Sequence, residues 1–192
     1  MKESENIKYK FLKNRKYSLR NYSIVPLRND DIVKIKTWRN EQINILRQKD
    51  LLSNSQQKEY YHSLIENSFY IIKPSEILFS FLLNDECIGY GGLVHIDWVK
   101  KIGEISFIND TTRASNDELY RSDFKNFISL LFGITFSELK FSKVTTETYG
   151  IRTNTLRLLD ELGFKLNHVI ENNIQINNKK YNSFFHEYSN NK

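Results

Sequence analysis

Glu104 is the residue of this chain whose type and setting best suit proton transfer. It lies between Gly103 and Ile105 in a segment whose composition predicts a β-strand, and a polar loop follows that strand. A carboxylate held on a strand can accept a proton from a bound group, directly or through a water molecule. The alternative, which stays open at this point, is a glutamate on the solvent-facing side of the strand.

The loop from Asn109 to Asp123 joins this strand to a long apolar helix and has the features of an anion site. A helix N-terminus offers free N–H groups and a positive dipole end, both of which favour phosphate. Arg113 and Arg121 add positive charge, and Asn116 tolerates a positive φ in a loop that has no glycine. The loop therefore predicts a phosphate-binding segment, and a solvated connection with incidental arginines is the alternative.

Other residues with chemical potential form weaker patterns. His95 and Asp97 alternate along a strand, so both are expected on one face, where they could act together on a hydroxyl group. The single cysteine, Cys87, falls within a strand pattern and is expected to be a small core residue. No spacing of His, Cys and Asp predicts a metal site, and no nucleophile elbow predicts a serine hydrolase.

The elements that position these residues follow a strand-rich order. A first strand and two helices come before a run of strands, and the second helix begins with a Ser53–Gln56 capping box. Asn84-Asp85 predicts a hairpin turn, and the three glycines at 89, 91 and 92 predict a bulge or a closely approached backbone. Counting that first strand, strands are expected at 22–27, 76–84, 86–96, 100–110, 143–149, 164–172 and 180–188, with an apolar helix at 124–139.

Composition limits the class of protein. A chain of 192 residues that is 40% hydrophobic can build one core. We expect a single domain at 18–188, a polar N-terminal extension at 1–17 and a tail at 189–192. No apolar run approaches the roughly 18 residues of a membrane span, and the N-terminus lacks a signal-peptide pattern, so we expect a cytoplasmic protein without a membrane partner.

The net charge of +5 has two interpretations. Basic residues crowd the first twenty positions, which suits either a solvated surface or an arm that meets nucleic acid. The sequence has no aromatic RNA-recognition motif, zinc knuckle or arginine-rich recognition helix. We therefore expect no nucleic-acid partner.

The order of elements from Glu86 to Phe164 resembles the acyl-CoA-binding half of the GNAT family of N-acetyltransferases. The matching parts are the strand, the loop that opens a helix, the strand KVTTETY and a helix that closes on Leu-Gly-Phe. An N-terminal strand ending in Pro-Leu-Arg and a helix carrying Trp-Arg-Asn match the family's opening. The resemblance covers about residues 18–188. It implies an α/β (α+β) fold, with a mixed, mostly antiparallel sheet of about seven strands flanked by helices.

The same resemblance implies acetyl-CoA as co-substrate, bound where the fourth and fifth strands splay, and no metal. Glu104 takes the role of the base that removes a proton from the attacking amine. A backbone N–H near Phe107 to Asn109 polarises the thioester carbonyl, and the loop holds the pyrophosphate. The implied cofactor-binding residues are Phe107, Ile108, Asn109, Arg113, Ala114, Ser115, Asn116, Tyr120, Arg121, Ser122 and Arg152.

Three features depart from the family pattern: the cofactor loop, the position of Leu159, and the position of Arg152, where many members have an asparagine that contacts the cofactor. The cofactor loop of the family usually carries glycines, and this loop has none. Many members have a tyrosine four residues before the glycine of Leu-Gly-Phe that protonates the departing thiolate, whereas this chain has Leu159 there. Tyr149, just after the fifth expected strand, or Tyr120 could replace it.

On the acceptor side the chain has the segments Trp38-Arg39-Asn40-Glu41-Gln42 and Leu46-Arg47-Gln48. These segments resemble the subgroup that acetylates amino sugars or the N-termini of ribosomal proteins. The resemblance implies a primary amine on a nucleotide-linked amino sugar used in surface polysaccharide biosynthesis. A peptide N-terminus and a non-catalytic GNAT-like binding module are the alternatives, and the chain is expected to be a monomer or a homodimer. The implied substrate-binding residues are Trp38, Arg39, Asn40, Arg47, Gln48, His95 and Asp97.

Overall fold

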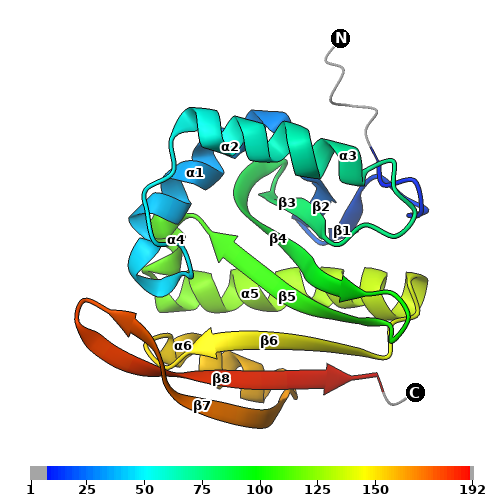
Figure 1. The fold of residues 1–192 in the computed structure, drawn as a ribbon. Helices are drawn as coiled ribbons and strands as arrows, with labels where there is room; N and C mark the ends of the chain where they lie inside the picture. The colour runs from blue at the N-terminus through cyan, green and yellow to red at the C-terminus, as the bar shows by residue number, and fades with distance from the viewer. Residues whose placement is uncertain (1–7, 191–192) are drawn as a thin grey trace.

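The computed structural model describes residues 8–190, which form one twisted sheet with helices on both faces (Figure 1). Helices α1 to α3 cover one face of the N-terminal half, and α5 and α6 lie on the opposite face. The strands are β1 Tyr17–Leu19, β2 Tyr22–Pro26, β3 Ile77–Leu83, β4 Glu86–Asp97, β5 Ile102–Asn109, β6 Lys143–Tyr149, β7 Lys165–Ile176 and β8 Lys179–Ser189. The α-helices are α1 Ile32–Glu41, α2 Asn54–Tyr60, α3 Glu66–Ser68, α4 Thr111–Ala114, α5 Asp117–Phe132 and α6 Thr153–Glu161.

The strand order is β1-β2-β3-β4-β5-β6-β8-β7, so the described sheet has eight strands where about seven were expected. The additional strand is the short β1. Every neighbouring pair is antiparallel except β5 and β6, which run parallel. The predicted mixed, mostly antiparallel sheet flanked by helices is therefore confirmed.

The described part of the N-terminal extension packs against the core. Tyr9 is fully buried, and Leu12 is nearly so. The Tyr9 hydroxyl donates to the Leu78 carbonyl and accepts from the Leu78 N–H, at 2.8 and 2.7 Å. The described part of the segment expected as a polar extension is therefore anchored to the core by single apolar side chains among its lysines. Residues 1–7 and 191–192 lie outside the described part of the chain.

Two local expectations, the capping box at Ser53 and the hairpin turn at Asn84-Asp85, are confirmed. Ser53 accepts a hydrogen bond from the Gln56 N–H, and the Gln56 side chain accepts one from the Ser53 N–H, which is the predicted capping box. Asn84 and Asp85 both adopt positive φ, the conformation that a tight hairpin between β3 and β4 requires. At Gly89 a Cβ would lie 2.8 Å from the Ile108 carbonyl oxygen, so β5 approaches β4 too closely for a side chain.

An aromatic cluster fixes β5 against α5. The rings of Phe107 and Phe127 lie 4.6 Å apart. Phe81 packs edge-on against both of these rings, and Phe124 packs edge-on against Phe107. Burial of such rings contributes on the order of 2–3 kcal/mol each. One face of β5 is thereby anchored to the core, and the alternate residues, Glu104 among them, face the other way.

Within residues 8–190, no helix is both long enough and apolar enough to cross a membrane.

Candidate active site

A cleft opens where β5 and β6 separate. The two strands pair only from Ile102 to Glu104, where Glu104 is the partner of Thr145, and they diverge beyond that point. The fourth and fifth expected strands are β5 and β6, so the expected splay between them is present. The cleft has a volume of about 290 Å³ and passes between the strands from one face of the sheet to the other.

The cleft brings together eight of the residues expected at the site. They come from α1, the loop before α2, β4, β5, β6 and the turn before α6. They are Arg39, Arg47, His95, Glu104, Phe107, Ile108, Tyr149 and Arg152.

Arg47 forms a bridge across one mouth of the cleft. Its Nη2 lies 3.1 Å from Glu104 Oε1, and the same nitrogen contacts Glu147 Oε2 on the neighbouring strand. Both carboxylates raise the pKa of the Arg47 guanidinium against the opposing effect of its burial. Half of the Arg47 side chain is exposed, whereas only 9% of the Glu147 side chain is. One cation thus holds two carboxylates at the point where the strands part.

Tyr149 lies at the same mouth, on the strand that carries Glu147. Its burial raises the pKa of the phenol above its ordinary value, although the nearby Arg47 lowers it in part. Tyr149 therefore keeps its proton at neutral pH and can donate it. Tyr120, the other expected donor, is 6% exposed and hydrogen bonds to Thr155 Oγ1 at 2.8 Å, so it does not line the cleft.

The substrate segment of α1 serves mainly to hold the loop that carries Arg47. Arg39 donates to Tyr90 Oη at 2.6 Å and to Gln48 Oε1 at 3.0 Å. Asn40 Oδ1 accepts from the Gln48 side chain and from the Leu52 N–H. Asn40 and Gln48 thus lie behind the cleft and position the loop, and they do not line it.

Trp38 points away from the cleft. Its side chain is 6% exposed, and it borders a separate groove that Cys87 and Asp110 also line. The expected role of Trp38 in substrate binding does not fit this placement. Trp38 and Arg39 are consecutive residues of α1, so their side chains leave the helix about 100° apart and face different directions.

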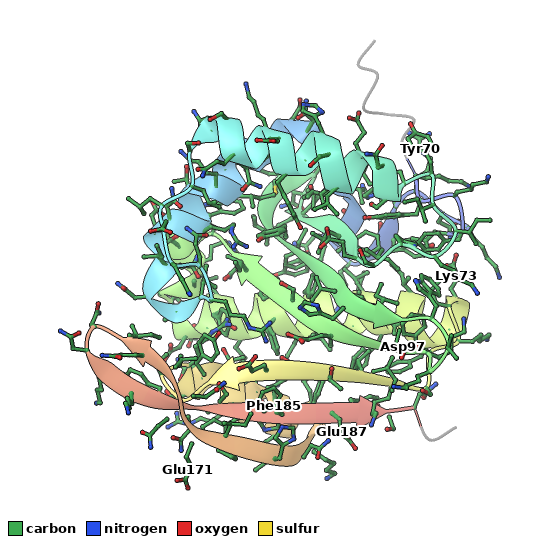
Figure 2. All side chains as sticks on the ribbon, in the orientation of Figure 1. Tyr70, Lys73, Asp97, Glu171, Phe185 and Glu187 are labelled. Atoms are coloured by element: carbon green, nitrogen blue, oxygen red, sulfur yellow. The ribbon has the colours of Figure 1, made fainter. Side chains whose placement is uncertain are left out.

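The His95–Asp97 pair expected on one strand face does not form. The register of β4 against β5 shifts between Val94 and Asp97, and His95 adopts a φ of 51°. This irregularity breaks the alternation of side chains. Asp97 instead accepts hydrogen bonds from the N–H groups of Val99 and Lys100 in the β4–β5 turn (Figure 2). His95 remains at the cleft, where Glu76 is its charged neighbour.

The loop after β5 satisfies its own N–H groups. The Asp110 carboxylate accepts from the N–H groups of Thr112 and Arg113, and the Asn116 side chain caps α5 by accepting from Glu118 and Leu119. Asn116 has a φ of −106°, so the positive φ expected in place of a glycine is wrong. The helix N-terminus is therefore already occupied by side-chain oxygens.

The two loop arginines are also engaged. Arg113 makes a bidentate ion pair with Asp123, with both nitrogen–oxygen distances at 2.7 Å, and Asp123 is fully buried. Arg121 pairs with Glu161 of α6 on the surface. The remaining expected cofactor residues of this segment lie outside the cleft: Asn109, Ala114, Ser115, Asn116, Tyr120 and Ser122.

Arg152 differs from these two arginines. It lines the cleft, donates only to Tyr120 Oη at 3.2 Å, and has no carboxylate partner among the described residues. It precedes the first residue of α6, where the helix dipole also favours an anion. Arg152 is the guanidinium of this site that is best placed to meet a phosphate.

The family model described as an acetyltransferase (GNAT) domain matches residues 24–185. The chain belongs to the GNAT family. No curated protein matches the sequence.

Several solved structures share the GNAT fold with this domain. The spermidine N-acetyltransferase of Vibrio cholerae, solved with CoA and spermine, has a TM-score of 0.76 at 16% identity, covering 89% of this chain and 96% of that one. A dodecameric structure of that enzyme gives a TM-score of 0.73 at 16% identity, with coverages of 89% and 95%. A putative acetyltransferase has a TM-score of 0.69 at 12% identity, with coverages of 93% and 88%.

The GNAT cleft fits one part of acetyl-CoA better than the other. Beyond Glu104, β5 no longer pairs with β6, so the main-chain groups of Ile105–Ile108 that are directed toward β6 are available to the amides of the pantetheine arm, whereas those directed toward β4 are paired. The loop offers the pyrophosphate few free N–H groups, since Asp110 and Asn116 occupy them. Within residues 8–190, no cluster of three His, Cys, Asp or Glu side chains could hold a metal ion.

Sequence reasoning missed several residues of the cleft. Glu147 lies in the KVTTETY strand, one strand away from Glu104, and Glu76 precedes β3. A signal for Glu147 was present, since it alternates with Tyr149 on the strand. For Glu76 the sequence held no signal, because the contact that positions it is a hydrogen bond from the Tyr60 hydroxyl, 3.0 Å from both carboxylate oxygens, which only the tertiary structure creates. The other missed lining residues are Ile45, Leu46, Val94, Ile105, Ser106, Phe124, Thr146, Thr148, Thr155 and Leu159.

Proposed function

We propose that this GNAT domain transfers an acetyl group from acetyl-CoA to a primary amine bound at the Arg47 mouth of the cleft. The observation that carries the proposal is the position of Glu104. Its carboxylate lies at the last paired residue of β5, where the strands part to admit the thioester. A protonated amine must lose a proton before its nitrogen can attack, and Glu104 is placed to accept it.

Arg47 and Glu147 complete the acceptor side. When the ammonium group of the acceptor binds beside Glu104, it takes the place of the Arg47 guanidinium. The Glu104 carboxylate therefore still has a positively charged partner. Arg47 is half exposed and keeps Glu147 as an anchor when it moves. Tyr149, which stays protonated at neutral pH, supplies a proton to the departing thiolate.

The remaining groups hold the two reactants together. Main-chain N–H groups near Phe107 and Ile108 polarise the thioester carbonyl, and Arg152 meets a phosphate of the cofactor. Holding amine and thioester in one cleft is itself worth roughly 7–11 kcal/mol of the barrier. The direct transfer needs no metal.

For the acceptor we propose an amino sugar linked to a nucleotide. The net charge of +5 favours anionic ligands. Arg47 is the acceptor-side guanidinium that is half exposed, so it can turn toward a diphosphate, whereas Arg39 is committed to Tyr90 and Gln48.

A polyamine is the second candidate acceptor. Glu76, Glu104 and Glu147 put three carboxylates in the cleft, and a structural neighbour is a spermidine N-acetyltransferase. Arg39, Arg47 and Arg152 balance these three charges, which leaves little attraction for a molecule with several positive charges. This balance is why we place the polyamine second.

A thiol-release assay with acetyl-CoA tests the proposal. The acceptors are nucleotide-linked 4-amino sugars, the same sugars without the nucleotide, spermidine and short peptides. Turnover that is greatest with a nucleotide-linked sugar is the expected result. Turnover with spermidine or peptides alone would replace the acceptor and keep the acetyltransferase, and no thiol release with any amine would favour a non-catalytic binding module.

A further inference from the structure

Four large apolar side chains are exposed along one edge of the molecule. Three of them, Tyr70, Ile71 and Ile72, are consecutive in the loop between α3 and β3, with exposed fractions of 69%, 49% and 62%. Val99, in the turn between β4 and β5, is 92% exposed. Figure 2 shows Tyr70 and Lys73 of the loop and Asp97 beside the turn on the same edge. Exposed apolar side chains that gather in one region are typical of a contact surface, whereas single scattered ones need no explanation.

Hydrogen bonds hold this loop and this turn together. The Trp98 indole N–H donates to the Pro74 carbonyl oxygen at 2.7 Å. The N-terminal segment joins them through the Lys10 N–H, which donates to the Phe69 carbonyl oxygen at 2.8 Å. The segments 8–13, 69–75 and 97–101 therefore adjoin one another, and we call their common surface the basic edge.

The basic edge carries more positive than negative charge. Its three segments contain one acidic residue, Asp97, which pairs with Lys100 at 3.5 Å and caps the turn by accepting from the N–H groups of Val99 and Lys100. Glu66 and Glu138 belong to the adjoining helical segments and do not balance the excess of lysines. Exposed apolar side chains bordered by lysines combine the two properties that attract a protein to an anionic lipid surface. The lysines of the basic edge are Lys8, Lys10, Lys13, Lys73, Lys100 and Lys101.

We propose that the basic edge binds the surface of an anionic lipid bilayer. Tyr70, Ile71, Ile72 and Val99 enter the boundary between headgroups and acyl chains, and the lysines meet the lipid phosphates. A second copy of the chain would bring lysines against lysines, and a nucleic acid would leave the isoleucines in water. The expected absence of a membrane partner rested on the absence of a spanning segment, which a site on the bilayer surface does not require.

Binding at the basic edge leaves the active site open. No residue of its three segments lines the cleft between β5 and β6. The cofactor loop follows the C-terminal end of β5, whereas the β4–β5 turn precedes the other end of that strand (Figure 1). The inference therefore does not depend on which amine is the acceptor, and it can be tested without turnover.

Co-sedimentation with lipid vesicles tests the basic edge. The purified chain is mixed with vesicles of phosphatidylcholine alone and with vesicles of phosphatidylcholine and phosphatidylglycerol, at low and at high salt. The isoleucine variant, Ile71→Ser with Ile72→Ser, removes two apolar side chains and keeps every lysine. The control variant, Leu166→Ser with Ile170→Ser, replaces two apolar residues of β7 that are 52% and 42% exposed. Circular dichroism checks that each variant is folded.

The wild type and the control variant are expected to bind the mixed vesicles more tightly than the neutral ones, and high salt should weaken this binding. The partition coefficient of the isoleucine variant should be lower by about tenfold or more, because interfacial affinity scales with the apolar area that is buried. Absence of binding to the mixed vesicles, or equal partition coefficients for the wild type and the isoleucine variant, overturns the inference. Sedimentation velocity without lipid provides a second test: self-association of the wild type that the isoleucine variant loses would assign the basic edge to a second copy of the chain and overturn the membrane site.

Discussion

Removal of the Arg113 side chain should destabilise the fold, because this arginine neutralises a buried carboxylate. Asp123 is fully buried and accepts two hydrogen bonds of 2.7 Å from Arg113. In the variant Arg113→Ala, only Asn109 Nδ2 and the Tyr22 hydroxyl, each at 3.2 Å, remain to hold the charge.

The magnitude follows from the cost of an uncompensated buried charge. Removing one partner of a buried ion pair typically costs about 3–5 kcal/mol, which for a chain of this size lowers the Tm by roughly 6–20 °C. Arg121→Ala is the matched control, since Arg121 and Glu161 are 51% and 37% exposed, and such pairs contribute about 0–1 kcal/mol. Asp123→Asn added to Arg113→Ala should recover part of the loss by removing the charge.

Urea unfolding monitored by circular dichroism measures the free energy of unfolding of the four proteins. A large loss in Arg113→Ala, little change in Arg121→Ala and partial recovery in the double variant are expected. An Arg113→Ala protein whose free energy of unfolding is within about 1 kcal/mol of wild type would refute the structural role. Arg113 would then be available for phosphate, as the sequence alone suggested.

Three further predictions concern Glu104, Glu76 and Cys87. Glu104→Gln should lower turnover by about 100-fold or more near neutral pH, with a smaller loss at higher pH, where free amine is abundant. The control variant Glu171→Gln, on the exposed strand β7, should have no effect on turnover. Equal rates for wild type and Glu104→Gln would exclude Glu104 as the base. Burial raises the pKa of Glu76, so the native state binds that proton more tightly than the unfolded chain, and the free energy of unfolding should fall as pH rises from the ordinary carboxyl pKa through the raised one. Urea titrations over this range should show a shallower fall in Glu76→Gln, and identical slopes would contradict the assignment. Burial raises the pKa of the Cys87 thiol to about 12, so an aromatic disulfide reagent should modify the native protein at least about 100-fold more slowly than the protein in denaturant, and rapid native modification would show that the thiol is accessible.

The fold could be predicted from local signals because each one acts over a few residues. The Ser53–Gln56 box, the Asn84-Asp85 turn and the glycines beside β5 all report backbone geometry that is decided within the segment. The number of strands was less certain because β1 has three residues and little pattern of its own.

The site could be predicted only in part, because its contacts join distant segments. Arg47 meets Glu104 and Glu147 across 57 and 100 positions, a convergence that only the tertiary structure creates. The loop illustrates the opposite case. Asn116 followed by two acids is the signature of a helix cap, and this local signal predicts a self-satisfied loop more directly than it predicts a phosphate cradle.

Two other misplacements have specific physical causes. The register shift after Val94 separates His95 from Asp97, the last residue of β4, whose side chain caps the turn to β5, and an irregularity of this kind leaves no mark in a pattern of alternating side chains. Trp38 and Arg39 are adjacent on α1 and therefore face different directions, so one of them could reach the cleft and the other could not.

Hydrogen exchange with and without acetyl-CoA is the most direct test of the account, because it asks whether the cofactor occupies the cleft between β5 and β6. Acetyl-CoA bound in the cleft should slow the exchange of amides within Ile105–Ile108 and in the segment around Arg152, with little change in the Asp110–Asn116 loop, whose N–H groups are already bonded. Protection confined to the loop, or no protection anywhere at saturating acetyl-CoA, would contradict it.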